Sequence, residues 1–379
     1  MEGTVFVILA TLFVAYTNGA NDNFKGAATL LGSGTIPDYQ KALAWATVTT
    51  LAGSVTAFFF AEKLVRTFSG KGLVPDHLTA SPEFLLAVAC GAGATVLLAT
   101  VTGMPVSTTH SLTGALAGAG LVAVGADLGF AALGRNFIAP LLFSPVCAVV
   151  LTVVIYPLFR FCRRMTGVSK STCICLDRKE IPVAGVNLVH GQAISVTQLQ
   201  SLGIFVGETS QCQAMAMDRY SGQILGMAAR DILNALHFLS AGLVSFARGL
   251  NDTPKIAALI VMTGALGLKF NIALVAVVMA LGGLLSAKKV AQTMSYRITG
   301  MNHGQGFTAN LVTALTVIFA SNWGVPVSTT HVSCGALFGI GAVNGKARWT
   351  MIGIIMAAWI LTLPVAAGFS GGLYYFLRG

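Results

Sequence analysis

The hexapeptide Pro-Val-Ser-Thr-Thr-His occurs twice, at 105–110 and again at 326–331, each time inside a long apolar run. Proline cannot continue a helix, but it suits the first turn of the next one. A serine or threonine just behind the proline is a preferred helix cap. Each copy therefore predicts a helix, a break and a second helix whose N-terminus carries three hydroxyl groups.

A second motif is repeated in the same order. Gly-Ala-Asn-Asp at 19–22 in the first half of the chain matches Gly-Leu-Asn-Asp at 249–252 in the second half. Two different motifs that recur in one order indicate a duplicated fold. We expect a first membrane repeat in 1–159 and a second in 229–379. Between them, the polar segment 160–228 is expected to form a small irregular or strand-containing lobe.

The composition indicates a membrane protein. Only 9% of the residues are charged, 55% are hydrophobic and the mean hydropathy is +0.78, whereas soluble domains carry about 25% charged residues. Several apolar runs are long enough to cross a bilayer as helices, which takes about 20 residues. They cover 41–61, 84–102, 137–159, 229–247, 271–287, 306–323 and 349–376. We therefore predict an all-α polytopic membrane protein whose first unit, 4–33, is interrupted at 18–23. Residues 1–18 lack a basic start and are expected to be a retained helix rather than a signal peptide.

The distribution of basic residues predicts the orientation. If each hexapeptide segment enters and leaves by the same membrane face, each repeat crosses an odd number of times and the two repeats are inverted. One face then holds fourteen basic residues and the other holds six: Lys63, Arg66, Lys71, Arg135, Lys269 and Arg378. The face richer in lysine and arginine is normally cytoplasmic. The segment 160–228 should therefore lie in the cytoplasm, and both termini outside.

The hydroxyl triplets Ser107, Thr108, Thr109 and Ser328, Thr329, Thr330 are candidates for oxyanion binding. A helix N-terminus offers free N–H groups and about half a positive charge, which suits an oxyanion. The alternative is a capped helix packed by small residues, which accounts for one hydroxyl but not for three in a row, twice. His110 and His331 could add positive charge or could be neutral, hydrogen-bonded histidines.

Asp22 and Asp252 are the only acidic residues deep within apolar surroundings. An ionised carboxylate in a membrane is costly and usually functional. Together with the amide oxygens of Asn21 and Asn251, these carboxylates form an oxygen-rich set suited to a small hard cation such as Na⁺. The structural alternative is an ion pair with the lysine three residues on, Lys25 or Lys255. Arg248 is either a helix-end residue or a substrate guide, and the sequence does not decide between them.

Electrostatics connect the two candidate sites. Two carboxylates beside an anion site would repel the anion, so cations bound to them would make the binding of anion and cation mutually dependent. Inverted repeats with broken helices that meet near the midplane are typical of secondary transporters. An anion channel and a membrane enzyme acting on phosphoryl groups are the competing classes. The duplicated aspartates argue against the channel. Nothing here indicates nucleotide hydrolysis, nucleic-acid binding or an organic cofactor.

The paired Gly-x-Asn-Asp and Pro-Val-Ser-Thr-Thr-His motifs resemble those of the inorganic phosphate transporter (PiT) family. The resemblance covers both membrane halves but excludes most of 160–228. It implies symport of inorganic phosphate with Na⁺ or H⁺ by a multi-pass protein of the cell membrane, in a homodimer. Related members carry sulfate or metal–phosphate complexes. We expect the hydroxyl triplets to bind phosphate, and Asn21, Asp22, Asn251 and Asp252 to bind Na⁺, with alternating access between the two faces.

Overall fold

The computed structural model describes residues 2–70, 72–169, 172–182, 198–208, 210 and 225–378. Within these residues, seven helical segments are long and apolar enough to cross a membrane. They are Glu2–Asp22, Tyr39–Phe60, Pro82–Thr102, Thr108–Asp127, Phe130–Met165, Leu268–Ser286 and Trp349–Leu377. The predicted class, a largely helical polytopic membrane protein, is confirmed. Of the basic residues used to predict the orientation, Lys71 on the poorer face and Lys170 and Arg219 among the fourteen of the richer face lie outside the described residues.

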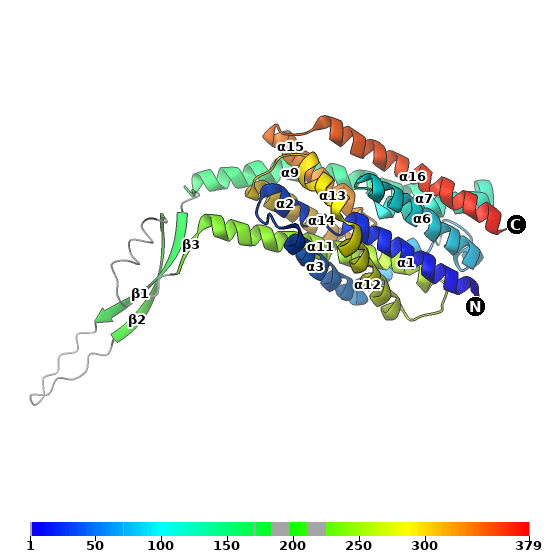
Figure 1. The fold of residues 1–379 in the computed structure, drawn as a ribbon, viewed down its shortest axis with the longest axis horizontal. Helices are drawn as coiled ribbons and strands as arrows, with labels where there is room; N and C mark the ends of the chain where they lie inside the picture. The colour runs from blue at the N-terminus through cyan, green and yellow to red at the C-terminus, as the bar shows by residue number, and fades with distance from the viewer. Residues whose placement is uncertain are drawn as a thin grey trace, which may run out of the picture. The chain divides into compact units, whose positions relative to one another are not determined.

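The first repeat begins with α1, which carries the Asn-Asp motif, and its hexapeptide lies between α6 and α7 (Figure 1). Its helices, in order, are α1 (Glu2–Asp22), α2 (Ala28–Ser33), α3 (Tyr39–Phe60), α4 (Glu62–Phe68), α5 (Asp76–Thr79), α6 (Pro82–Thr102), α7 (Thr108–Val124), η1 (Gly125–Asp127), α8 (Phe130–Leu133), η2 (Gly134–Ile138) and α9 (Ala139–Met165). Those of the second repeat are α11 (Ala229–Val261), α12 (Leu268–Ser286), α13 (Lys288–Gln292), η3 (Thr293–Arg297), α14 (His303–Trp323), α15 (Thr329–Asn344) and α16 (Trp349–Leu377).

Both hexapeptides lie where one helix of a hairpin ends and the next begins. α6 and α14 end at Gly103 and Gly324, which share a φ of 74°. This left-handed conformation favours glycine and closes the helix. α7 and α15 then start behind the capping residues Ser107 and Ser328. The predicted sequence of helix, break and helix is confirmed in both halves.

The two Asn-Asp motifs differ in their backbone. In the first copy, α1 ends at Asp22 and a turn leads to α2. In the second copy, α11 continues through the motif and Pro254 to Val261, so the helix does not end near 247 as the sequence suggested. When the two motifs are aligned, the residue that corresponds to Gly26 is Ile256, which is fully buried. Gly26, in contrast, packs so closely on Ser245 of α11 that a Cβ there would collide.

Helices of different repeats pack against each other through small residues. α1 packs on both α6 and α12. A Cβ added to Gly19 would collide with the carbonyl of Met279, and one added to Gly282 would collide with the carbonyl of Tyr16. Small residues at such crossings let helix backbones approach closely in a membrane. This packing holds the end of α1, and therefore Asp22, against the second repeat.

Residues Leu158–Leu236 form a separate compact unit. It contains a three-stranded antiparallel sheet in the order β2-β1-β3, made of β1 (Thr172–Pro182), β2 (Gln198–Glu208) and β3 (Leu225–Ala228). β1 and β2 pair from Thr172 opposite Glu208 to Pro182 opposite Gln198. Residues 183–197 and 211–224 of the predicted polar segment lie outside the described residues.

Candidate functional site

The N-termini of α7 and α15 meet inside the membrane unit. The hydroxyl of Thr109 donates to the carbonyl of Val327 (3.4 Å), and that of Thr330 donates to the carbonyl of Val106 (2.7 Å). Each hexapeptide thus bonds to the backbone of the other copy. The rings of His110 and His331 lie 4.3 Å apart between centroids. The two copies therefore build one buried site.

The three hydroxyls of each triplet have different partners. Ser107 and Ser328 accept a hydrogen bond from the N–H of the histidine three residues on, at 3.1 Å in both copies, and so cap their helices. Thr108 accepts from the amide of Asn18 (2.9 Å), and Thr329 donates to Asp252 (3.3 Å). Only one residue of each triplet is therefore a helix cap, while the other hydroxyls bond to Asn18, to Asp252 or to the opposite copy.

Two buried lysines cross between the repeats. Lys25 donates to Thr330 of the other copy and to the carbonyl of Val106 (3.4 Å) in its own copy. Lys255 donates to Thr109 of the other copy (3.0 Å) and to the carbonyl of Val327 (2.6 Å) in its own. Both side chains are only 1% exposed. Each ammonium group is thus held against a hydroxyl motif at the centre of the protein.

The same lysines pair with the carboxylates. Lys25 forms an ion pair with Asp22, and Lys255 lies 3.6 Å from Asp252. The amide nitrogen of Asn18 is 3.4 Å from an oxygen of each carboxylate. The two Asp–Lys ion pairs, which were the structural alternative, are therefore present. The lysines of these pairs also contact the hydroxyl motifs.

Asn21 and Asn251 hold the backbone just before each hydroxyl motif. Asn21 donates to the carbonyl of Met104 (3.0 Å) and accepts from the N–H of Val106 (3.1 Å). Asn251 donates to the carbonyl of Val327 (3.2 Å) and accepts from Ser321 (3.1 Å). An amide oxygen has two lone pairs, so the oxygen of each Asn can accept one further contact.

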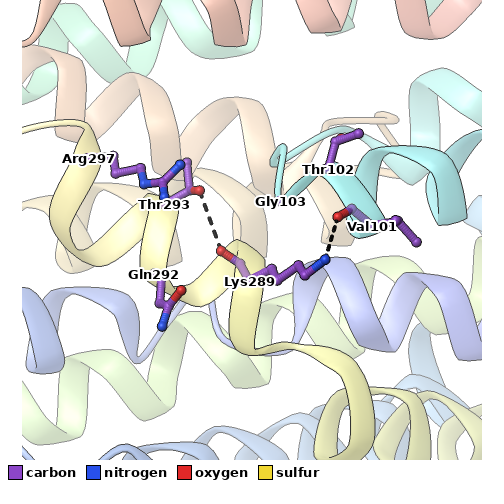
Figure 2. Close-up of a pocket in the computed structure, with 7 residues that line it drawn as sticks. All are labelled: Val101, Thr102, Gly103, Lys289, Gln292, Thr293 and Arg297. Atoms are coloured by element: carbon purple, nitrogen blue, oxygen red, sulfur yellow. Dashed lines mark hydrogen bonds between the residues drawn. The ribbon is translucent and has the colours of Figure 1, made fainter.

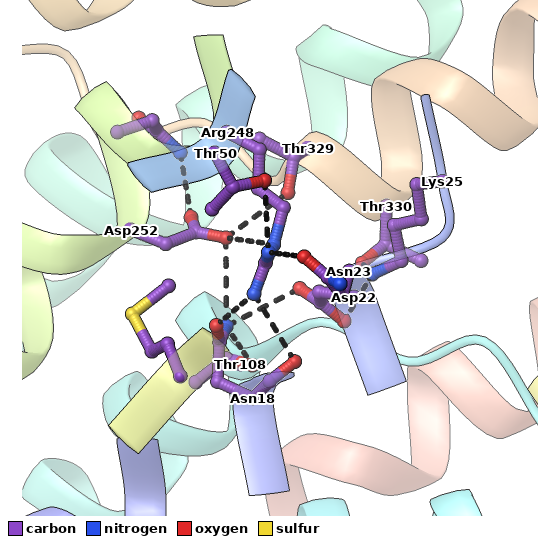
Figure 3. A network of polar contacts seen from close by, with 12 residues as sticks. Asn18, Asp22, Asn23, Lys25, Thr50, Thr108, Arg248, Asp252, Thr329 and Thr330 are labelled. Carbon is purple, nitrogen blue, oxygen red and sulfur yellow. Dashed lines mark hydrogen bonds and ion pairs between the residues drawn. The ribbon is translucent and has the colours of Figure 1, made fainter. Parts of the chain in front are cut away.

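Arg248 organises the cluster to a degree that the sequence did not reveal. Figure 3 shows its guanidinium between Asn18, Asn23 and Asp252. It donates to the side-chain oxygens of Asn18 (2.6 Å) and Asn23 (3.0 Å), and its Nε lies 3.9 Å from Asp252. Asn18 and Asn23 were not proposed as site residues. The sequence signal for the role of Arg248 was an arginine in an apolar run, four residues before Asp252.

The formal charge of the cluster favours an anion. It contains two carboxylates, Asp22 and Asp252, and three cations, Lys25, Arg248 and Lys255, so one positive charge is left over. All five residues are at most 3% exposed. Because buried charges interact strongly in a low-dielectric interior, the excess positive charge and the two helix N-termini together attract an anion.

Comparison with known proteins identifies the family. A family model described as "Phosphate transporter family" matches residues 18–370. A putative phosphate permease of Haemophilus influenzae is 27% identical over 402 residues, covering 97% of this chain and 94% of the relative. A probable low-affinity inorganic phosphate transporter of Rhizobium meliloti is 29% identical over 384 residues, covering 98% and 95%.

The fold also matches a solved structure, described as "The sodium-dependent phosphate transporter". The TM-score is 0.75 and the sequence identity is 22%, with 100% of this chain and 99% of the other covered. The family described by the matching model consists of transporters, not enzymes. Because the family model spans both membrane repeats and the two motifs that build the site, the chain belongs to the phosphate transporter family.

Proposed function

We propose that this protein is a secondary transporter that imports inorganic phosphate by symport with Na⁺. The observation that carries the proposal is the crossed arrangement, in which the lysine of each repeat reaches the hydroxyl motif of the other. Phosphate would lie between the N-termini of α7 and α15. There it would receive hydrogen bonds from both triplets and from the ammonium groups of Lys25 and Lys255.

The carboxylates offer a basis for selecting phosphate over sulfate. At neutral pH phosphate keeps at least one P–OH group that can donate a hydrogen bond, whereas sulfate has none. Asp22 accepts from Lys25, which also reaches Thr330, and Asp252 accepts from Thr329, so both carboxylates lie next to the hydroxyl motifs. A site built to accept a hydrogen bond rejects an analogue that lacks the donor, because its own acceptor is left unpaired.

The proposed coupling is an exchange of partners. Na⁺ bound by the carboxylates of Asp22 and Asp252 and the amide oxygens of Asn21 and Asn251 would replace the lysine ammonium groups as counter-ions. The freed ammonium groups, which already contact Thr330 and Thr109, would then bind phosphate. The description of the solved relative as sodium-dependent supports Na⁺ as the cation.

A proton is the second candidate for the coupling cation, and the same ion pairs favour it. Protonation of Asp22 or Asp252 would neutralise the carboxylate and release its lysine just as a bound Na⁺ would. The two cations differ in the gradient that drives transport, so experiment can separate them.

Alternating access is supported by the matched contacts of the two halves. Thr109 and Thr330 occupy matching positions and donate to Val327 and Val106, which also match. Thr100 and Ser321 match as well, and each bonds to the asparagine of its own motif, although Thr100 accepts and Ser321 donates. We propose that the halves are inverted repeats, so that rearranging one half against the other opens the site to alternate faces.

Phosphate uptake into proteoliposomes tests the function. We expect accumulation of phosphate driven by an inward Na⁺ gradient, reduced when Na⁺ is replaced by choline. Uptake driven by a pH gradient in Na⁺-free medium would instead support proton coupling. Downhill phosphate flux that requires neither cation would contradict symport and support a channel.

Thr109→Val and Thr330→Val each remove one hydroxyl at nearly constant volume. If that hydroxyl contacts phosphate, its loss should cost about 1.5–3 kcal/mol, as for a hydrogen bond to a charged group. We therefore expect the apparent phosphate affinity to fall about tenfold or more. Thr113→Val is the matched control, because Thr113 is equally buried in α7 but has no hydrogen-bond partner among the described residues. If all three variants kept the apparent phosphate affinity of the wild type, the triplets would serve helix structure alone.

The proposed orientation, with 160–228 in the cytoplasm, is tested by thiol labelling. Thr166 follows α9 and Glu62 begins α4, and both are exposed. In a cysteine-free background, we expect Glu62→Cys to react with a membrane-impermeant reagent in intact cells. Thr166→Cys should react only after permeabilisation. The reverse pattern would show that the protein has the opposite orientation.

A further inference from the structure

A polar pocket lies beside the tip of the first hairpin, outside the central site. Its volume is about 290 Å³, and it is lined by Val101, Thr102, Gly103, Lys289, Gln292, Thr293 and Arg297 (Figure 2). Two of these residues are cations, three have hydroxyl or amide groups, and none is acidic. Among the described residues, neither Lys289 nor Arg297 forms an ion pair with a carboxylate. The lining therefore has the chemistry of an anion site.

The fold fixes the position of Lys289. Its ammonium group donates to the carbonyl of Val101 (3.0 Å) in the last turn of α6, and its own carbonyl accepts from Thr293 (3.4 Å). A cation at a helix C-terminus is stabilised by the free carbonyls there. An ammonium group has three N–H donors, so the bond to Val101 leaves donors for an anion in the pocket.

The second hairpin has the same lysine contact, and in both places the threonine four residues on donates to the lysine's carbonyl, Thr67 to Lys63 (3.0 Å) and Thr293 to Lys289 (3.4 Å). Lys63 donates to the carbonyl of Asn322 (3.4 Å), and Asn322 precedes its hexapeptide by as many residues as Val101 precedes the first. Gly324 next to it matches Gly103 in position and in φ. The duplicated fold thus places a lysine at the tip of each hairpin. Lys63 is therefore a natural control for the capping role of Lys289.

The pocket and the central site share a stretch of backbone. Gly103 lines the pocket, Met104 and Val106 bind Asn21, and Ser107 caps α7. An anion in the pocket would thus lie only a few residues along the chain from the hydroxyl triplet. The pocket therefore adjoins, along the chain, the segment that carries the first hydroxyl triplet.

We propose that this pocket is a second, weaker site for a phosphate group, with Lys289 and Arg297 as its charged ligands. The inference rests on the proposed transport of phosphate, for which the pocket is a waiting site on the path. The phosphate group is that of the free ion or of a lipid headgroup, since both present the same tetrahedral oxyanion to the two cations.

The test counts phosphate bound per chain by equilibrium dialysis with radioactive phosphate, using purified protein in nanodiscs of zwitterionic lipid. We expect two sites in the wild type and one, the tighter, in the double variant Lys289→Gln with Arg297→Gln. Lys63→Gln should keep both sites. Conversely, Thr109→Val with Thr330→Val should weaken the tighter site and leave the weaker one. Failure of the central site and failure of the pocket are therefore distinguishable.

A second arm identifies a lipid source. The transporter is placed in nanodiscs that contain phosphatidic acid and is then released from them. Native mass spectrometry counts the lipids that the transporter retains. If the headgroup occupies the pocket, the wild type and Lys63→Gln retain one more phosphatidic acid than the double variant. The proposal is overturned if the double variant matches the wild type in both arms, or if Lys63→Gln loses as much as the double variant.

Discussion

Replacement of Arg248 by glutamine is expected to abolish phosphate transport and to destabilise the protein. The guanidinium contacts Asn18, Asn23 and Asp252, which lie on α1, on the turn that follows it and on α11. Breaking a buried ion pair costs about 3–5 kcal/mol when the remaining charge is left uncompensated. Asp252 keeps Lys255 as its partner, so we expect the loss of stability to come chiefly from the amide oxygens of Asn18 and Asn23, which lose their charged donor. The variant also removes the excess positive charge of the cluster. We therefore expect uptake to fall by at least about 100-fold, which corresponds to about 2.7 kcal/mol.

Two further variants separate these effects. Arg66→Gln removes an exposed arginine whose pair with Glu62 (2.6 Å) lies on the surface, and such pairs contribute about 0–1 kcal/mol. It should leave both thermal stability and uptake unchanged. Arg248→Lys keeps the charge but cannot reach several partners at once with a planar fork. We expect it to recover part of the stability but little of the transport. Uptake by Arg248→Gln within threefold of the wild type would remove Arg248 from the site.

Asp22→Asn and Asp252→Asn are expected to disconnect phosphate transport from the cation. Each variant removes a negative charge and keeps an oxygen of similar size. If the carboxylates hold Na⁺, both variants should need far more Na⁺ for half-maximal uptake. Their apparent phosphate affinity should also fall, by about 5–150-fold, because coupling between two ligands is reciprocal.

A charge-matched variant tests whether the ion pair is merely structural. Asp22→Asn alone leaves Lys25 buried without its carboxylate, whereas Asp22→Asn combined with Lys25→Met removes both members of the pair. If the pair serves only folding, the double variant should restore thermal stability and Na⁺-dependent uptake together. If Asp22 holds Na⁺, the double variant should recover thermal stability but not Na⁺-dependent uptake. A channel would instead conduct the anion as well as the wild type or better once the carboxylate is lost.

The local features of this fold were predictable from sequence because they depend on neighbouring residues. Ser107 and Ser328 cap their helices as expected from their position after a proline, and the breaks at both hexapeptides follow from the same residues. The continuous α11 was not predicted, because the apolar run ends at 247, whereas the helix continues through Pro254 to Val261 among buried residues such as Ile256.

The contacts that build the site could not be predicted in the same way. That Lys255 reaches Thr109 rather than its own triplet depends on how two segments far apart in the chain cross in space. The motifs indicated which groups take part, but not that each lysine bridges the two copies. Arg248 was ambiguous for the same reason, because its partners Asn18 and Asn23 come from the other repeat.

The most direct test of the central claim is phosphate binding to purified protein at fixed pH, titrated with NaCl against matched choline chloride. The claim is that one anion site, built by both repeats, is coupled to Na⁺ through Asp22 and Asp252. We predict tighter phosphate binding in NaCl than in choline chloride for the wild type, and no such difference for Asp22→Asn or Asp252→Asn. Equal binding of phosphate in both salts by the wild-type protein would contradict the sodium coupling.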